Sequence, residues 1–208
     1  MPIMTVTEAL KKRRAIKEYD PGFVIPEKDI NELFAKTLLT PSSFNLQHWR
    51  FAAVVDPAMK TRLCEASWGQ RHIRDASLVV VLAGNLDAAE SASEYWRHAP
   101  ANVQDRLVPR IGKFYEDDHQ LKRDEAIRSA SLAAMSLMLV ATEMGYETCP
   151  MIGFDAPQVI EIVRMPENWI PVMMITVGRG TREPRPKPGQ LKVEDVAFWN
   201  AFDGEPVR

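Results

Sequence analysis

Residues 40–51 read TPSSFNLQHWRF, and this is the most informative stretch of the chain. Its polar and aromatic side chains stand just before an apolar run, and they are Pro41, Ser42, Ser43, Phe44, Asn45, Gln47 and Trp49. Asn and Gln amides match the donor and acceptor edge of a heterocycle, and aromatic rings supply the apolar wall of a small-molecule site. An ordinary polar loop between a helix and a strand, with Trp49 as a core anchor, explains the same residues. Taken alone, the stretch favours that structural explanation.

The flanking sequence predicts a helix before this stretch and a strand after it. Pro26 suits a first helical position, and RFAAVVD (50–56) has the composition of a strand. Further along, SLVVVLAG (77–84) is a continuous apolar run, typical of a strand buried on both faces. The expected helices are about 5–17, 26–38, 57–66, 121–144 and 155–165, with helical character over 87–120, and the remaining expected strand is 171–177. This order predicts an α/β or α+β domain in which helices dominate.

Composition limits the classes of function. The chain has 208 residues, a formal charge of −2 and a pI near 6.1, which argues for one domain and against general nucleic-acid binding. The start has no long apolar stretch of the secretory kind, and the most apolar window, 132–141, is too short to span a bilayer. Cys64 and Cys149 form no CxxC pattern, so we expect reduced thiols in a cytoplasmic protein with no membrane partner.

Two basic segments stand out against this neutral background. Residues 11–21 read KKRRAIKEYDP, and a second group contains Arg179, Arg182, Arg185 and Lys187. Guanidinium and ammonium groups form charge-assisted bonds to phosphate oxygens, so both segments are candidates to meet on one phosphate. Basic residues near a helix C-terminus also complement the helix dipole, and a basic run is often a solvated face. From these residues alone, that structural explanation is favoured.

A third segment, PMIGFD (150–155), contains Gly153, which permits close backbone approach to a flat ligand. It also fits a turn into a helix capped by Asp155, and the two explanations are compatible. Other motifs are missing from the sequence: there is no GxGxxG after a strand, no P-loop and no GxSxG. The four histidines have no metal-ligand spacing, so no metal site is expected.

RRAIKEYDP, TPSSFNLQHWRF and ETCPMIGFD occur in an order and spacing that resemble the nitroreductase family of FMN-dependent oxidoreductases, over roughly residues 7–188. The Pro-Ser-Ser-x-Asn-x-Gln-x-Trp core is the most specific of the three signals. The resemblance implies a single α+β domain over 1–208, a three-layer sandwich of a mixed β-sheet flanked by helices. It also implies a homodimer with two FMN sites at the subunit interface, where helix 121–144 packs against its twin. Residues 87–120 would form a variable helical lid, and residues 181–208 an extended C-terminal arm.

The resemblance also implies roles for individual residues. The implied cofactor-binding residues are Arg13, Arg14, Ala15, Lys17, Pro41, Ser42, Ser43, Asn45, Gln70, Ile152, Gly153, Arg185 and Lys187, with 41–45 supplied by the other subunit. The candidates for acceptor contacts are Phe44, Tyr95, Trp96, Phe114 and Tyr115, although simple packing explains the lid aromatics equally well. Three positions depart from the family pattern: Ala15 replaces Ser, His48 replaces Pro, and His72 stands where some members have a Lys near the ring.

The implied activity is hydride transfer from NADH or NADPH through flavin N5 to a nitroaromatic or quinone-type acceptor, in two half-reactions. The flavin performs the chemistry, so no catalytic side chain is expected. Alternatives on the same fold are a dehalogenase, an oxidase of peptide-derived rings, an enzyme that fragments the flavin and a non-catalytic flavin-binding protein. A dimeric helical interaction protein without cofactor is a further alternative.

Overall fold

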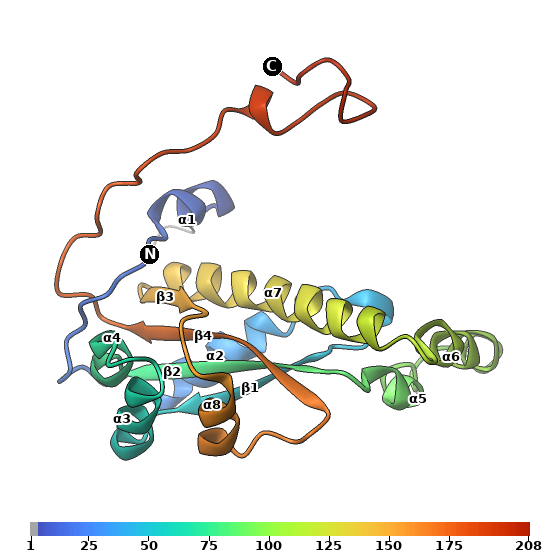
Figure 1. The fold of residues 1–208 in the computed structure, drawn as a ribbon, viewed down its shortest axis with the longest axis horizontal. Helices are drawn as coiled ribbons and strands as arrows, with labels where there is room; N and C mark the ends of the chain where they lie inside the picture. Colours follow the sequence, from blue (N-terminus) through green and yellow to red (C-terminus); the bar gives the residue numbers. More distant parts are fainter. Residues whose placement is uncertain (1–3) are drawn as a thin grey trace.

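A four-stranded sheet between two helical layers forms the centre of the fold (Figure 1), in a computed structural model that describes residues 4–208. The strands are β1 (Trp49–Val54), β2 (Leu78–Asn85), β3 (Glu147–Met151) and β4 (Trp169–Gly178), in the spatial order β1-β2-β4-β3. One face of the sheet is covered by α2 (Glu27–Thr37) and α7 (His119–Glu143). The other is covered by α3 (Pro57–Glu65), α4 (Arg71–Asp75) and α8 (Ala156–Val163). The α+β class and its three layers are therefore confirmed.

Strand β2 is the most buried element of the sheet. All eight of its residues are buried, and alternate side chains enter the two helical layers. Val80 packs in the core beneath α2 and α7, whereas Val79 and Val81 pack against α3 and α8. The continuous apolar run at 77–84 thus reflects burial on both faces of the sheet, as the sequence predicts.

Helix α7 packs closely on the sheet along one side. A Cβ atom at Gly84 would lie only 2.9 Å from the Ala126 Cβ, so glycine and alanine together allow the close approach of β2 and α7. Among residues 4–208, α7 is the one helix long and apolar enough to cross a membrane by length and composition, and half of its apolar window is buried inside the fold. The helix is longer than the apolar window at 132–141 on which the sequence argument relied.

The sheet differs from expectation in two ways. Each neighbouring pair of its four strands is antiparallel, so it is not mixed; a parallel pairing occurs at the isolated bridge between Ala15 and Thr148. Strand β3 was not expected, because it is short and contains Pro150 and polar residues rather than an alternating pattern. It lies at the edge of the sheet, where a proline is tolerated.

The first helix is shorter than expected. Helix α1 (Val6–Lys12) begins with a capping box, in which the Glu8 backbone N–H donates to Thr5 Oγ1 over 3.2 Å. It ends at Arg13, whose ψ of 125° is extended. The helix does not continue to Lys17, because the backbone there pairs with β3 instead: the Ile16 N–H donates to the Thr148 carbonyl over 3.0 Å.

Residues 87–120, here named the lid after the expected role, and residues 181–208, named the tail, differ in how they pack. The lid contains α5 (Ala92–Tyr95) and α6 (Ala101–Tyr115), which share a separate apolar cluster with Leu46. The tail leaves β4 and extends past α1 to the C-terminus (Figure 1). It contains a three-residue 3-10 helix, Val193–Asp195, and ends in a small closed turn in which the Trp199 N–H donates to Glu205 O over 2.8 Å.

Candidate functional site

Backbone pairing brings the two basic segments together. Residues 15–20 run as an extended chain between β3 and the start of the tail. Ala15 bridges Thr148 on one side, and Tyr19 bridges Gly180 on the other. The Thr181 N–H donates to the Glu18 carbonyl over 3.0 Å, so the residues that follow, 182–188, leave the sheet beside residues 13–18. Segments more than 160 residues apart are thus neighbours because both pair with the same corner of the sheet.

These segments line a cavity of about 650 Å³. Its wall carries six cationic and two acidic side chains together with Pro150, and the charged residues are Arg13, Arg14, Lys17, Glu18, Arg182, Glu183, Arg185 and Lys187. Its volume lies within the usual range for small-molecule sites, about 300–1,000 Å³. An excess of cations around a space of this size favours an anionic ligand of moderate size.

Two of the cations also have structural partners. The Arg14 guanidinium donates to the carbonyls of Lys11 and Arg13, at the C-terminal end of α1. The Arg182 side chain forms an exposed ion pair with Glu18, with 3.0 Å between Nε and Oε2. The helix-dipole explanation of the basic run therefore applies to Arg14. Arg13, Lys17 and the cations of residues 182–187 also line the cavity.

A second group of predicted residues lies at the end of β3. Gln70 Nε2 donates to the Gly153 carbonyl over 2.9 Å, which joins the start of α4 to the segment after β3. A Cβ at residue 153 would lie 3.2 Å from the Trp68 ring and 3.3 Å from Gln70 Nε2, so glycine is required for this close packing. Ile152 is 77% exposed and presents its surface to solvent beside these groups. Pro150 lines the cationic cavity, and Ile152 and Gly153 follow it in the chain, so this second group of residues adjoins the cavity.

His72 does not supply a cation at this site. Its side chain is buried, and its Nε2 atom has no hydrogen-bond partner. Burial and then the nearby charge of Lys17 lower the pKa of His72, while Asp75 opposes them. The imidazole is therefore neutral at pH 7, and Lys17 remains as the permanent charge. Burial also raises the pKa of both thiols, Cys64 and Cys149, which makes them poor nucleophiles.

Loop 42–47 (Ser42–Gln47) lies at the other end of the sheet. The β-sheet register pairs Trp49 with Gly84, whereas Val177, the β4 partner of Thr148, pairs with Leu78. Six residues of β2 separate these positions, or about 20 Å at roughly 3.3 Å per residue. Loop 42–47 contributes no residue to the wall of the cationic cavity. One chain therefore gathers the predicted residues of the two basic segments around the cavity and joins Gln70 to Gly153 beside it. It leaves Pro41, Ser42, Ser43 and Asn45 at a distance.

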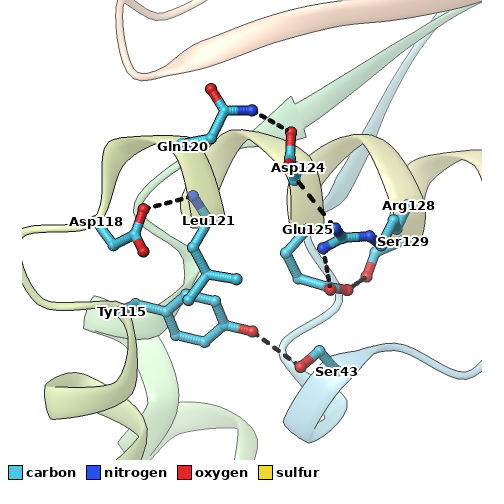
Figure 2. A network of polar contacts seen from close by, with 9 residues as sticks. All are labelled: Ser43, Tyr115, Asp118, Gln120, Leu121, Asp124, Glu125, Arg128 and Ser129. Atoms are coloured by element: carbon cyan, nitrogen blue, oxygen red, sulfur yellow. Dashed lines mark hydrogen bonds and ion pairs between the residues drawn. The ribbon is translucent and has the colours of Figure 1, made fainter.

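The lid aromatics contact loop 42–47. Figure 2 shows the Tyr115 hydroxyl pointing at Ser43, and the two oxygens are 2.8 Å apart. Trp96 Nε1 donates to the Phe44 carbonyl over 2.9 Å, and Tyr95 accepts from the Arg50 guanidinium. Phe114 is 53% exposed, and its ring meets Phe44 edge to face with 5.5 Å between centroids. Phe44 and Phe114 are thus the more exposed pair, Tyr95 and Trp96 are half-buried, and Tyr115 is buried. A role in acceptor binding stays a prediction for all five.

The nitroreductase family profile matches residues 10–179, which is most of the chain. The chain belongs to the nitroreductase family. Its recognition from sequence is confirmed, and so is its class as an oxidoreductase. Bacillus subtilis MhqN, provisionally named an NAD(P)H nitroreductase, is 39% identical over 193 residues, covering 89% of this chain and 94% of MhqN.

Solved structures agree with this membership. The crystal structure of B. subtilis YdfN, provisionally called a nitroreductase, has a TM-score of 0.89 and 35% identity, covering 93% of this chain and 97% of that one. A provisionally named nitroreductase from Exiguobacterium sibiricum, solved in complex with FMN, has a TM-score of 0.88 and 29% identity, with coverage of 94% and 97%. The nitroreductase fold of this chain is therefore shown along nearly its whole length.

Sequence reasoning missed two features of this nitroreductase. Trp68 is 73% exposed, has a positive φ of 56° and covers Gly153, but a single Trp in SWGQ gives no periodic or motif signal. Thr148 joins β3 to the basic segment, and its Oγ1 is buried without a partner. Its importance depends on the pairing with Ala15, which no local pattern predicts.

Proposed function

We propose that this nitroreductase is a homodimeric FMN-dependent oxidoreductase that uses NADH or NADPH to reduce nitroaromatic or quinone-type acceptors in two half-reactions. The observation that carries the proposal is the meeting of the two basic segments around one cavity of about 650 Å³. A terminal phosphate explains why residues far apart in sequence supply the cations, and the relative solved with FMN supports this choice of ligand.

The residues present fit FMN in charge and in shape. Arg13, with Arg185 or Lys187 from the tail, offers guanidinium and ammonium donors for a doubly charged phosphate. Further along, Gly153 packs closely against Trp68 and Gln70, so this part of the site carries no side chain of its own at residue 153. A flat ring system beside Gly153 and a phosphate beside Arg13 match the two ends of the cofactor.

Each part of the site then has a defined task. FMN, when bound, supplies the atom that accepts and releases hydride. Arg14 and Lys17 are assigned to the ribityl chain or the pyrimidine edge. The positive charge of Lys17 would stabilise a negatively charged ring there. The neutral His72 would not contribute to this stabilisation. Gln70 orients the Gly153 carbonyl. The backbone N–H groups of Ile152 and Gly153 are assigned to the ring, to which they would donate.

A second copy of the chain completes the site. Pro41, Ser42, Ser43 and Asn45 lie at the opposite end of the sheet from the cationic cavity, about 20 Å away along β2. A partner subunit would bring its own loop 42–47 to this chain's cavity. Exposed apolar side chains on α7, after α2 and on the tail offer the surface for such contacts; they include Leu132, Leu39, Trp199 and Phe202. The tail would then embrace the partner.

The decisive experiment is spectroscopic. The purified protein is mixed with FMN, passed through a desalting column, and titrated without oxygen with NADH and with NADPH. A retained flavin spectrum that either nicotinamide bleaches, and that a nitroaromatic or quinone restores, is the expected result. A yellow protein that neither donor bleaches would support the non-catalytic alternative, and a colourless one would end the proposal. Light scattering of the same sample tests the dimer.

A further inference from the structure

Loop 42–47 has an unusual backbone. Phe44, Asn45 and Gln47 have φ values of 49°, 56° and 48°, all in the left-handed region. Asn tolerates this conformation, but Phe and Gln rarely adopt it, so the backbone is strained at Phe44 and Gln47. Such a conformation persists only where surrounding structure holds it in place. The contacts around the loop therefore indicate what maintains it.

Several of these contacts are local. The Gln47 N–H donates to Ser42 Oγ over 2.9 Å, and Arg50 Nη1 donates to the Gln47 carbonyl over 2.8 Å. The Asn45 and Leu46 N–H groups donate to the Ser42 and Ser43 carbonyls, each over 3.0 Å. These bonds close the loop on itself and tie its end to β1, but none of them involves the Ser43 hydroxyl or the Phe44 carbonyl.

The support for the first half comes from the lid. Tyr115, at the end of α6, is 2% exposed and bonds to Ser43 through its hydroxyl. Trp96, just after α5, donates its indole N–H to the Phe44 carbonyl. Tyr95 accepts a hydrogen bond of 2.8 Å from Arg50, the residue that also holds Gln47. Two aromatic side chains of this segment thus direct polar atoms at the loop, and Tyr95 reaches it through Arg50.

The apolar contacts of the loop follow the same pattern. Leu46 is fully buried, and it packs with Ala88, Ala92, Ile111 and Tyr115 rather than with either layer beside the sheet. The loop is therefore anchored in the core of the lid. A displacement of α5 and α6 would change its conformation.

We propose that Tyr95, Trp96 and Tyr115 are positioning residues, whose polar atoms hold loop 42–47 in its left-handed conformation. Resting on the proposed function, the proposal adds that this conformation presents Ser42, Ser43 and Asn45 to the cofactor. The acceptor-contacting surface of the lid is then assigned to Phe114 and its neighbour Phe44, two exposed rings whose side chains take no part in these hydrogen bonds.

The first test measures the loop itself, without reference to the cofactor. The amides of Asn45, Leu46 and Gln47 are hydrogen-bonded within the loop, over 3.0, 3.0 and 2.9 Å. Hydrogen exchange of the full-length protein freed of FMN should show these amides exchanging about tenfold faster in Tyr115→Phe and in Trp96→Phe. Exchange in β2 should not change. Wild-type rates for the loop in both variants would overturn the proposal.

A double-mutant cycle separates the hydrogen bond between Tyr115 and Ser43 from general packing. Ser43→Ala removes the partner of the Tyr115 hydroxyl, so the combined variant should exchange no faster than either single variant. Thr61→Val serves as the control, because it removes a hydroxyl that bonds only to Pro57 O in α3. Additive effects of Ser43→Ala and Tyr115→Phe would contradict direct coupling.

The last readout is the dissociation constant of FMN. It should rise several-fold in Tyr115→Phe and stay unchanged in Thr61→Val. If wild-type protein does not take up FMN, the proposed function fails. The exchange data still show whether the lid residues hold loop 42–47 in place. If the loop exchanges faster but FMN binds as in wild type, the presentation of the loop to the cofactor is disproved.

Discussion

The two ends of the sheet are organised by different physical interactions. At the end near β3, backbone bridges from Ala15 and Tyr19 align two basic segments, and most of the side chains that matter are exposed and charged. At the end near β1, side-chain hydrogen bonds from the lid hold a left-handed loop over a buried cluster. Binding by charge acts over a distance and therefore tolerates small changes in the shape of the site, whereas a strained loop depends on individual hydrogen bonds. The predictions below test this contrast in order of decreasing effect.

The largest effect is expected from acid at the loop end. Burial, followed by a smaller effect of Arg50, lowers the pKa of His48 to about 4, while Glu125 opposes the shift; its ring also meets Tyr115 edge to face. The folded state therefore keeps His48 neutral where the unfolded chain, with a pKa near 6.5, binds a proton. The contribution to the free energy of unfolding is complete above about pH 6.5 and is lost as the pH falls toward 4, about 3 kcal/mol in all.

Denaturant unfolding at a series of pH values measures this loss. His48→Gln should flatten the curve between pH 6.5 and 4, whatever its effect on stability at pH 7. His72→Gln should flatten it less, because the pKa of His72 is lowered to a smaller extent. If the slope is the same in His48→Gln as in wild type, the buried neutral histidine does not control acid stability.

The next effect is at the cationic cavity. Arg13→Ala should raise the FMN dissociation constant about 30-fold, because a charged hydrogen bond contributes about 2 kcal/mol. Arg13→Lys should recover part of this loss, and added salt should weaken wild-type binding more than binding by the variant. Titration followed by flavin fluorescence gives the constants. Lys28→Ala, which removes an exposed charge on α2, is the matched control. Equal affinities for Arg13→Ala and Lys28→Ala would refute the phosphate assignment.

A smaller effect is expected where the backbone must stay open. A Cβ in Gly153→Ala would meet the Trp68 ring at 3.2 Å and Gln70 Nε2 at 3.3 Å, and both side chains can move slightly. Stability should fall by less than about 1 kcal/mol, while kcat/KM for an acceptor falls about tenfold as the two side chains shift. Steady-state kinetics with one quinone and one nitroaromatic make the measurement. An unchanged kcat/KM would show that Gly153 is not part of the functional site.

The smallest effect is expected at a position of the lid away from Tyr95, Trp96 and Tyr115. Gly112 lies within α6 and is exposed, and a Cβ added there would have no neighbouring atom within 4 Å. Gly112→Ala should stabilise the protein by about 0.5–1 kcal/mol, because alanine loses less backbone entropy in a helix. Loop exchange and FMN affinity should stay at wild-type values. A change in either would mean that α6 affects loop 42–47 through more than its aromatic contacts.

Sequence reasoning recovered the elements with strong local signals. These include the burial of β2 and the helices expected over 26–38, 57–66 and 121–144, which depend on residues a few positions apart and are all observed. It missed β3, the early end of α1 and the antiparallel order of the sheet, since these depend on which strand lies next to which. In the site, it identified the basic segments and Gly153 but not Trp68, whose position depends on a turn with positive φ.

The sequence by itself determined the nitroreductase family, the α+β class and the residue types available for an anionic, flat ligand. Periodicity, caps and motif spacing are short-range properties, so they can be interpreted without coordinates. Only the tertiary structure decided that residues 13–18 meet residues 182–188, that loop 42–47 lies at the opposite end of the sheet, and that His72 is neutral. Those outcomes depend on strand register and on desolvation, which arise when distant parts of the chain pack together and exclude water.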